Sequence, residues 1–263
     1  MSWPDLEEEL GYWSTANRRV PLWWRDDDAS DTSPALDRLL DLADEYGLGL
    51  GLAVIPAAAT LALSQRLATT RPDVRVLQHG YSHQNHAPQG ERFVELGLHR
   101  PAMMVAGEMG TGWLALERLF AERALPIMVP PWNRIAPSLI PILPEIGYRG
   151  LSTLGPRPRV HAAPGLLQVN VHVDIIDWRG GRQFAGDAAV IGALVAAMRQ
   201  RRGDRSSTGP EPIGLLTHHL VMDESAWVFM HRLFNQLKMV QAVSILPPHE
   251  AFAAVALSRT LSQ

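Results

Sequence analysis

Three histidines close together give this sequence its clearest chemical signal. His79, His83 and His86 directly follow the apolar run Val74–Leu77. Imidazole is the commonest metal ligand of proteins near neutral pH, because its neutral form offers a lone pair without a charge penalty. The spacing of the first two histidines puts both rings on one side of a helical turn or of a loop that leaves a strand. The cluster therefore favours a metal site over a histidine-rich surface loop.

A second polar cluster contains the carboxylates that such a site needs. Arg25, Asp26, Asp27 and Asp28 follow another apolar run, Val20–Trp24. The chain has no cysteine, so any metal must be held by His, Asp or Glu.

The composition of the chain limits the kinds of molecule that it is expected to bind. The chain has 263 residues, of which 46% are hydrophobic and 19% charged, as in an ordinary globular protein. Its net charge of -3 gives no electrostatic basis for binding nucleic acid or an anionic membrane. No run reaches the length of a membrane span, and the acidic N-terminus lacks the apolar core of a signal peptide, so we expect a cytoplasmic protein. Eight tryptophans and nine methionines leave room for an apolar interface, which is compatible with a homo-oligomer.

Short apolar strands and helices alternate along the chain. The predicted strands are Val20–Trp24, Leu48–Ile55, Val74–Leu77, Leu125–Val129, Tyr148–Ser152, Leu167–Val173, Ile213–Leu216 and Ala242–Leu246. The predicted helices are one from Pro34 that Gly47 stops, Ala57–Thr69, Pro101–Arg123, Pro137–Ile146, Asp187–Met198, Ser225–Met239 and Pro248–Leu261. Continuously apolar strands indicate a parallel sheet covered by helices, and this number of units favours a closed barrel over an open sheet. No Gly-x-Gly-x-x-Gly follows the first strand, which counts against a dinucleotide fold.

Three segments carry more specific expectations. Glycines make the first half of Pro101–Arg123 doubtful as a helix, so the firm helix is expected to start near Thr111. Residues 1–19 form an N-terminal segment ahead of the barrel, within a single domain that spans 1–263. Gly203–Pro212 is polar and rich in glycine, and is predicted to be a mobile loop.

Five polar clusters lie at the carboxyl ends of five predicted strands. They are Asp26–Asp28, His79–His86, Pro130–Arg134, Asp174–Trp178 and His218-His219. In a parallel barrel these strand ends converge on one face, where active sites lie. Each cluster alone could be a cap or a loop, but their shared position predicts one functional site.

The order and content of these clusters resemble the polysaccharide deacetylase family (the NodB-homology domain, carbohydrate esterase family 4). The family's first motif, Thr-Phe-Asp-Asp-Gly, corresponds to Arg25-Asp26-Asp27-Asp28-Ala29, and its second, His-Thr-Tyr-Ser-His, to His79-Gly80-Tyr81-Ser82-His83. The third, Arg-Pro-Pro-Tyr, is matched by Val129-Pro130-Pro131-Trp132, and the fourth, Asp-x-x-Asp-Trp, by Asp174, Asp177 and Trp178. The fifth, Leu-x-Leu-His, corresponds to Leu216-Thr217-His218. The resemblance covers about residues 20 to 250.

The resemblance implies an α/β fold, a distorted (β/α) barrel of about seven parallel strands, and metal-dependent hydrolysis of an amide in a small-molecule or carbohydrate substrate. By this analogy Asp28, His79 and His83 hold a divalent ion, with Zn²⁺ expected, and Asp27 is the base. His218 would protonate the leaving amine, with Asp177 or Asp174 orienting its imidazole. Trp178 would form an apolar wall for the acyl methyl, and Trp132 and Tyr81 would also contact the substrate.

Departures from the family pattern leave alternatives open. Three consecutive aspartates allow a second register, with Asp26 as base and Asp27 as ligand. The arginine of the third motif is Val129 here, so Arg25 or Arg134 would have to orient the base, and Arg134 is included in the expected catalytic set. Neighbours on a strand alternate faces, so only one of His218 and His219 is expected to point into the site, and His218 is favoured.

Other functions use similar residues. The same barrel could hydrolyse a non-sugar amide or imide, or serve as a non-catalytic binding protein. Two histidines and a carboxylate also form the facial triad of non-haem iron oxygenases, but those sites usually lie on antiparallel barrels. The strand–helix alternation of this sequence is evidence against an oxygenase.

Overall fold

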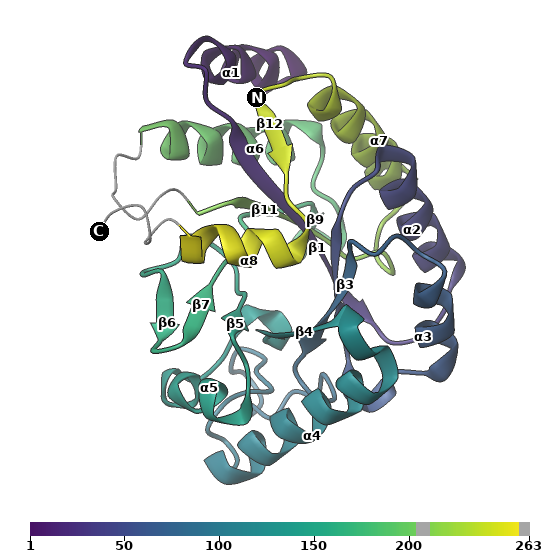
Figure 1. Ribbon diagram of the computed structural model, residues 1–263, viewed down its shortest axis with the longest axis vertical. Coiled ribbons are helices and arrows are strands. Elements are labelled where there is room, and N and C mark those ends of the chain that lie inside the picture. Colours follow the sequence, from purple (N-terminus) through teal and green to yellow (C-terminus); the bar gives the residue numbers. More distant parts are fainter. Residues whose placement is uncertain (204–210, 258–263) are drawn as a thin grey trace.

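The centre of the computed structural model, which describes residues 1–203 and 211–257, is a mostly parallel sheet (Figure 1). Its strands follow the order β6-β7-β5-β4-β3-β2-β1-β11-β8, with β12 paired to β1. They are β1 Val20–Ala29, β2 Leu50–Val54, β3 Val74–His79, β4 Ala124–Val129, β5 Gly150–Leu151, β6 His161–Ala163, β7 Leu166–Gln168, β8 Val173–Asp174, β11 Ile213–Thr217 and β12 Val243–Ile245. Among these described strands only β6 runs antiparallel to its neighbour. A separate hairpin joins β9 Ile176–Asp177 to β10 Gln183–Phe184.

One continuous segment, residues 166–174, closes the sheet into a barrel. At its start it pairs with β5 and the residues that follow β5, where the N–H of Val171 donates to the Thr153 carbonyl at 2.9 Å. At its end it pairs with β11, where the N–H of His172 donates to the Gly214 carbonyl at 2.8 Å. The strands β7 and β8 are therefore two parts of one interrupted strand between β5 and β11. The structure confirms a distorted (β/α) barrel of about seven parallel strands.

Helices surround the barrel, and α8 lies across its middle in the view of Figure 1. They are α1 Trp3–Thr15, α2 Pro34–Tyr46, α3 Leu61–Ala68, α4 Ala102–Phe120, α5 Leu143–Ile146, α6 Asp187–Gly203, α7 Glu224–Lys238 and α8 Pro248–Leu257. The start of α2 follows its sequence signals, because the Ser33 hydroxyl accepts from the N–H of Leu36 and Pro34 takes the first helical position. Within the described ranges, none of these helices combines the length and the apolar character that crossing a bilayer requires.

The prediction that α4 becomes firm only near Thr111 is wrong, because the helix begins at Ala102. Glycines cost a helix up to about 1 kcal/mol each relative to alanine, but burial of Val105, Met109 and Leu116 favours the helix more strongly. Gly112 is needed here, since a Cβ at this position would collide with the Gln78 amide on β3. The glycine thus allows α4 to lie close against the sheet.

Both ends of the chain add helices to the barrel. Residues 1–19 contain the 13-residue helix α1, whose Trp3 donates from its indole Nε1 to Asp187 of α6 at 2.8 Å. The last predicted helix is described as far as Leu257, and its remaining predicted residues lie outside the described part of the chain. Most of the predicted loop Gly203–Pro212 also lies outside the described residues.

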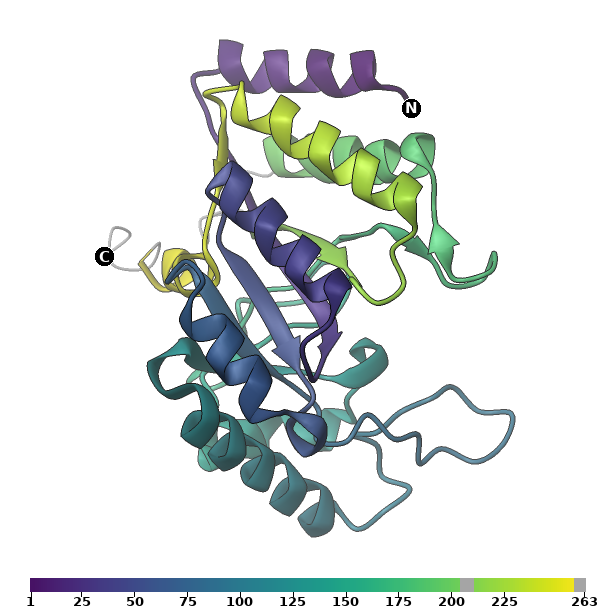
Figure 2. The same cartoon turned by 90° about the vertical axis from the view of Figure 1, so that its right-hand side faces the viewer.

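The two ends of the barrel differ in what covers them. Trp23, Leu77 and Val129 point inward and form one apolar cluster with Phe252 of α8, whose ring meets Trp23 edge-on at 5.9 Å between centroids. Helix α8 therefore covers the end at which the strands begin. The long loop between β3 and α4 and the β9–β10 hairpin project from the opposite side (Figure 2). The carboxyl ends of the strands are thus the end available for chemistry.

Candidate metal centre and active site

The three consecutive aspartates of β1 point in three different directions. Residues 23, 25 and 27 face the barrel interior, whereas residues 24 and 26 face the helices and the outer side of β11. Asp28 would follow Asp26 by alternation, but the pairing of β1 with β2 shifts register between Asp26 and Ala29. Asp28 has φ of 74° within this bulge, which turns its carboxylate toward β3.

Asp28, His79 and His83 converge on one point. The Asp28 Oδ1 lies 3.0 Å from Nε2 of His79 and 3.2 Å from Nε2 of His83, and these ligand atoms all lie within 4.8 Å of one another. Nδ1 of His79 lies 3.0 Å from the Val129 carbonyl, so a proton held there leaves Nε2 free to bind a metal. Two imidazole nitrogens and one carboxylate form a donor set that suits Zn²⁺ and leaves further coordination positions open. The third histidine of the cluster, His86, is not part of this group.

The charges of the triad depend on each other. Burial raises the pKa of Asp28, but hydrogen bonds from His79 and His83 outweigh burial and hold the pKa well below its ordinary value. Burial lowers the pKa of His79, yet the carboxylates of Asp27 and Asp28 outweigh it, so the net pKa is raised. The two carboxylates that favour a positive charge on His79 would also stabilise a cation bound there.

Asp27 lies beside the triad in a buried ion pair with Arg25. Nε of Arg25 lies 2.8 Å from Oδ1 of Asp27, and Nη2 donates to Oδ2 at 2.9 Å. The same guanidinium donates to Oδ1 of Asn133 at 2.7 Å and to the Ser152 hydroxyl at 2.8 Å, and both charged side chains are at most 2% exposed. Arg134, which was expected at the base, instead donates to the Phe93 carbonyl at 2.7 Å. The arginine that orients Asp27 is therefore Arg25.

The two adjacent histidines after β11 have different environments. The backbone N–H of His219 donates to Asp26 at 3.0 Å and its Nδ1 contacts the other oxygen of the same carboxylate. Burial lowers the pKa of His219, but Asp26 outweighs it and the net pKa is raised. His218 is 7% exposed, its Nδ1 has no hydrogen-bond partner among the described residues, and its ring meets Trp178 edge-on at 4.6 Å. Of the two imidazoles, that of His218 is the one available to a substrate.

Asp174 and Asp177 also separate into two roles. Asp174 accepts from the indole N–H of Trp178 at 2.8 Å and from the N–H of Ile176 at 3.0 Å. Burial raises the pKa of Asp174 above its ordinary value although the nearby His218 lowers it, which places this carboxylate in the electrostatic reach of His218. Asp177 is exposed and accepts from the backbone N–H groups of Arg179 and Gly180 in the β9–β10 turn. The carboxylate next to His218 is thus Asp174.

Aromatic side chains form the wall beside the triad. Trp132 has φ of 53°, a region that bulky residues rarely adopt, and its ring lies 4.5 Å from His83 and 5.6 Å from Phe93. Tyr81 lies in the loop that joins His79 to His83, where its backbone carbonyl accepts from the N–H of Ala57. Trp178 covers the other side of the site on the β9–β10 hairpin.

Glu95 is a supporting residue that the sequence did not reveal. It is completely buried, and its carboxylate accepts from the N–H groups of Tyr81 and Ser82 and from the Ser82 hydroxyl, at 2.7–3.1 Å. Gly80 has φ of 56°, and a Cβ there would collide with this carboxylate. Glu95 therefore fixes the backbone that joins His79 to His83. It belongs to no periodic pattern and lies well past the histidines, so no sequence signal connected it with them.

Replacing Glu95 by glutamine is expected to weaken metal binding by about 10- to 100-fold, the range found for residues that support metal ligands. The amide nitrogen would face backbone N–H donors and leave one of them unpaired. The dissociation constant of Zn²⁺, measured by competition with a chelator, checks this effect. Glu91→Gln is the matched control, because Glu91 is an exposed glutamate of the same loop. An equal loss in both variants, or none in Glu95→Gln, would contradict the supporting role.

Comparison with known proteins places the fold. No protein-family model and no curated protein sequence matches the chain. Among solved structures, one from Mycobacterium smegmatis that is assigned to the polysaccharide deacetylases superposes with a TM-score of 0.62 at 15% identity, over 92% of this chain and 95% of that one. The Bc1960 peptidoglycan N-acetylglucosamine deacetylase gives 0.56 at 15% identity, over 89% of each chain. A family 4 carbohydrate esterase from Streptomyces lividans, in complex with acetate, gives 0.55 at 16% identity, over 87% and 92%.

Proposed function

We propose that this protein, which has the fold of the polysaccharide deacetylases, is a metal-dependent hydrolase that removes an acetyl group from an N-acetylated sugar or a related small amide. The observation that carries the proposal is the convergence of Asp28, His79 and His83 at the open end of the barrel, next to a buried Asp27. The parallel barrel is also evidence against a non-haem iron oxygenase, because the metal-binding triads of those enzymes usually lie on antiparallel barrels.

The residues present fit a divalent ion, with Zn²⁺ the expected one. Its three donors are neutral or anionic, include no thiolate, and leave coordination positions open as catalytic zinc sites do. When bound, the ion supplies Lewis-acid polarisation of the acyl carbonyl and lowers the pKa of water. Two proton transfers remain for the side chains of the protein: one from the attacking water and one to the leaving amine.

Asp27 is the base in this proposal. It is next to Asp28 in the chain, its charge acts on His79 of the triad, and Arg25 fixes the orientation of its carboxylate through two contacts. A carboxylate held in this way can accept the proton of the attacking water without reorienting. Opposite it, a backbone N–H beside Trp132 would donate to the oxyanion that develops on the acyl carbon.

His218 is the acid that protonates the leaving amine. His218 is buried, contacts Trp178, and has no hydrogen-bond partner for its Nδ1 among the residues that the structure describes. One ring edge is therefore left for a partner and the other for the substrate. Asp174 stabilises the protonated imidazole through charge, and Trp178 holds Asp174 while its ring provides an apolar wall for the acyl methyl. Tyr81 and Trp132 line the approach.

Metal removal and an acetate-release screen test the proposal together. The purified protein is expected to bind about one equivalent of Zn²⁺ or a similar ion, and to release acetate from N-acetylated sugar oligomers or from simple N-acetyl amides. Chelation should abolish this activity, and added Zn²⁺ should restore it. Absence of a bound metal after reconstitution, or a metal-bound protein that hydrolyses none of these amides, would overturn the hydrolase. The second result would favour a non-catalytic binding barrel.

Asp174→Asn is expected to lower kcat by about 10- to 100-fold, because His218 would lose the negative charge that stabilises its protonated form. Asp177→Asn is the matched control, a nearby aspartate on the β9–β10 hairpin, and should change kcat less than about twofold, since Asp177 caps an exposed turn. Steady-state kinetics of both variants, with metal content measured in parallel, check the assignment. A larger loss of kcat in Asp177→Asn than in Asp174→Asn would show that Asp177, not Asp174, stabilises the protonated His218.

A further inference from the structure

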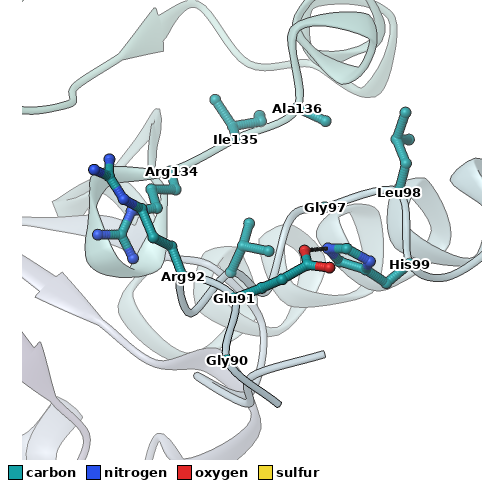
Figure 3. Close-up of a pocket in the computed structure, with 10 residues that line it drawn as sticks. Gly90, Glu91, Arg92, Gly97, Leu98, His99, Arg134, Ile135 and Ala136 are labelled. Atoms are coloured by element: carbon teal, nitrogen blue, oxygen red, sulfur yellow. Dashed lines mark ion pairs between the residues drawn. The ribbon is translucent and has the colours of Figure 1, made fainter. Parts of the chain in front are cut away.

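A hollow of about 730 Å³ lies next to the proposed active site, between the long loop after β3 and the segment that follows Trp132 (Figure 3). Arg92 and Arg134 occupy one end of it, and Glu91 and His99 lie along its floor. Ile135, Ala136 and Leu98 add apolar surface on the far side. None of these residues takes part in the proposed acetyl transfer to water.

The two arginines form a positive pair that makes no salt bridge within the described part of the chain. Their guanidinium groups lie near each other, and burial together with the charge of Arg92 lowers the pKa of Arg134 (Figure 3). Within residues 1–203 and 211–257, no carboxylate lies within ion-pair distance of either arginine. The one acid that lines the hollow, Glu91, has its carboxylate 3.7 Å from Nε2 of His99 and makes no ion pair with either arginine. Two like charges held together without a counter-ion are destabilising, and an anion between them removes that repulsion.

Arg134 is held in place, whereas Arg92 is an exposed side chain beside it. Arg134 is half-buried, and its Nη1 donates to the Phe93 carbonyl at 2.7 Å. Phe93 in turn meets Trp132 edge-on at 5.6 Å, and Trp132 lies 4.5 Å from His83 of the triad. Two aromatic contacts therefore connect the segment that holds Arg134 to the proposed metal centre. A ligand that reaches from Arg134 to the metal centre would pass Phe93, which is 55% exposed, and the half-buried Trp132.

We propose that Arg92 and Arg134 form an anion subsite that selects substrates with a carboxylate or phosphate group some distance from the amide to be cleaved. Guanidinium groups match the oxygen pairs of both anions, so the shared chemistry is an acidic, N-acetylated oligosaccharide or phosphosugar. The inference rests on the proposed deacetylase function for the bond that is cleaved, but its central claim concerns binding.

Charge-assisted contacts from two arginines are expected to favour an acidic ligand over a neutral one of equal length by tenfold or more at low salt. The preference should decrease as ionic strength rises, because the subsite is open to solvent. A neutral ligand lacks the group that the arginines recognise, so the ratio of the two affinities isolates the subsite from the rest of the binding surface.

Calorimetric binding in an Asp27→Asn background, where the proposed function predicts that no ligand is consumed, tests the subsite. One arm compares a hyaluronan tetrasaccharide, which carries carboxylates, with neutral N-acetylchitotetraose. The other compares N-acetylglucosamine 6-phosphate with N-acetylglucosamine. Arg92→Gln and Arg134→Gln should each reduce the preference for the acid, and the double variant should abolish it. Arg118→Gln, an exposed arginine on α4, is the control that should leave the preference unchanged.

Each outcome is decisive for the subsite. Preference in the first arm alone identifies a carboxylate, in the second alone a phosphate, and in both a general anion subsite. No preference in either arm, or a preference that survives in the double variant, overturns the proposal. Failure of the deacetylase function would show separately, as a wild-type protein that releases no acetate but still gives a measurable binding ratio.

Discussion

Replacing His79 or His83 by alanine is expected to remove the metal from the protein and to reduce amide hydrolysis to background. Each variant deletes one of the three ligands that converge within the described residues, and the two that remain cannot fill the coordination of a catalytic zinc ion. The loss should be complete for His79, whose ring is fully buried and held by the Val129 carbonyl, so no neighbour can replace it. Elemental analysis after dialysis, together with acetate release, measures both effects.

His86→Ala is the matched control for these two variants. His86 belongs to the same loop and the same sequence cluster, but it lies outside the group of converging ligands. It should keep about one equivalent of metal and near wild-type turnover. Loss of metal in His86→Ala, or retention in His79→Ala, would show that the ion is bound elsewhere and would contradict the triad.

The order of strands and the position of the site could be predicted from the sequence for a physical reason. Apolar runs that alternate with helices permit few arrangements, and a parallel barrel brings all its carboxyl strand ends to one face. The polar residues after the Val20–Trp24 and Val74–Leu77 runs were therefore expected to meet. The structure brings Asp28 and His79 to a separation of 3.0 Å.

The register of the three aspartates could not be predicted with the same certainty. Strand alternation alone gives Asp26 and Asp28 the same face, and it is the bulge at Asp28 that separates them. Bulges have no dependable sequence signature, and here a positive φ is adopted by a non-glycine residue. The family motif favoured Asp28 as the ligand, and the bulge gives the physical basis for that choice.

The alternation of side chains along a strand does explain why Arg25 reaches Asp27. Residues i and i+2 of a strand share a face, so Arg25 and Asp27 both point into the barrel. The guanidinium that the related motif places before two prolines is absent at Val129, which lies inside the apolar cluster. Arg134 was the nearer candidate along that motif, but its loop turns it toward Phe93. The contact of Glu95 with the loop that joins His79 to His83 is likewise set by loop geometry, which residue spacing does not encode.

Arg25→Met is expected to produce the largest loss of stability, about 3–5 kcal/mol in the free energy of unfolding, because it leaves the buried carboxylate of Asp27 without its partner. The same change frees Oδ1 of Asn133 and the Ser152 hydroxyl, which both accept from this guanidinium. Urea unfolding at fixed metal concentration measures the effect. Arg38→Met is the control, since the Arg38–Glu224 pair has equally short contacts of 2.7 Å but is exposed and should contribute at most about 1 kcal/mol.

The double variant Arg25→Met with Asp27→Asn distinguishes two contributions to the free energy of unfolding. One is the loss caused by an unpaired buried charge, and the other is the net contribution of the ion pair. Without a charge at position 27, the buried site no longer needs a counter-ion, so the double variant should be more stable than Arg25→Met alone. Turnover should stay low in Arg25→Met, in Asp27→Asn and in the double variant, because Asp27 is either absent or no longer oriented. If Arg25→Met lost no more stability than Arg38→Met, or if the second substitution recovered none of the loss, the buried pair would not be what holds Asp27 in place.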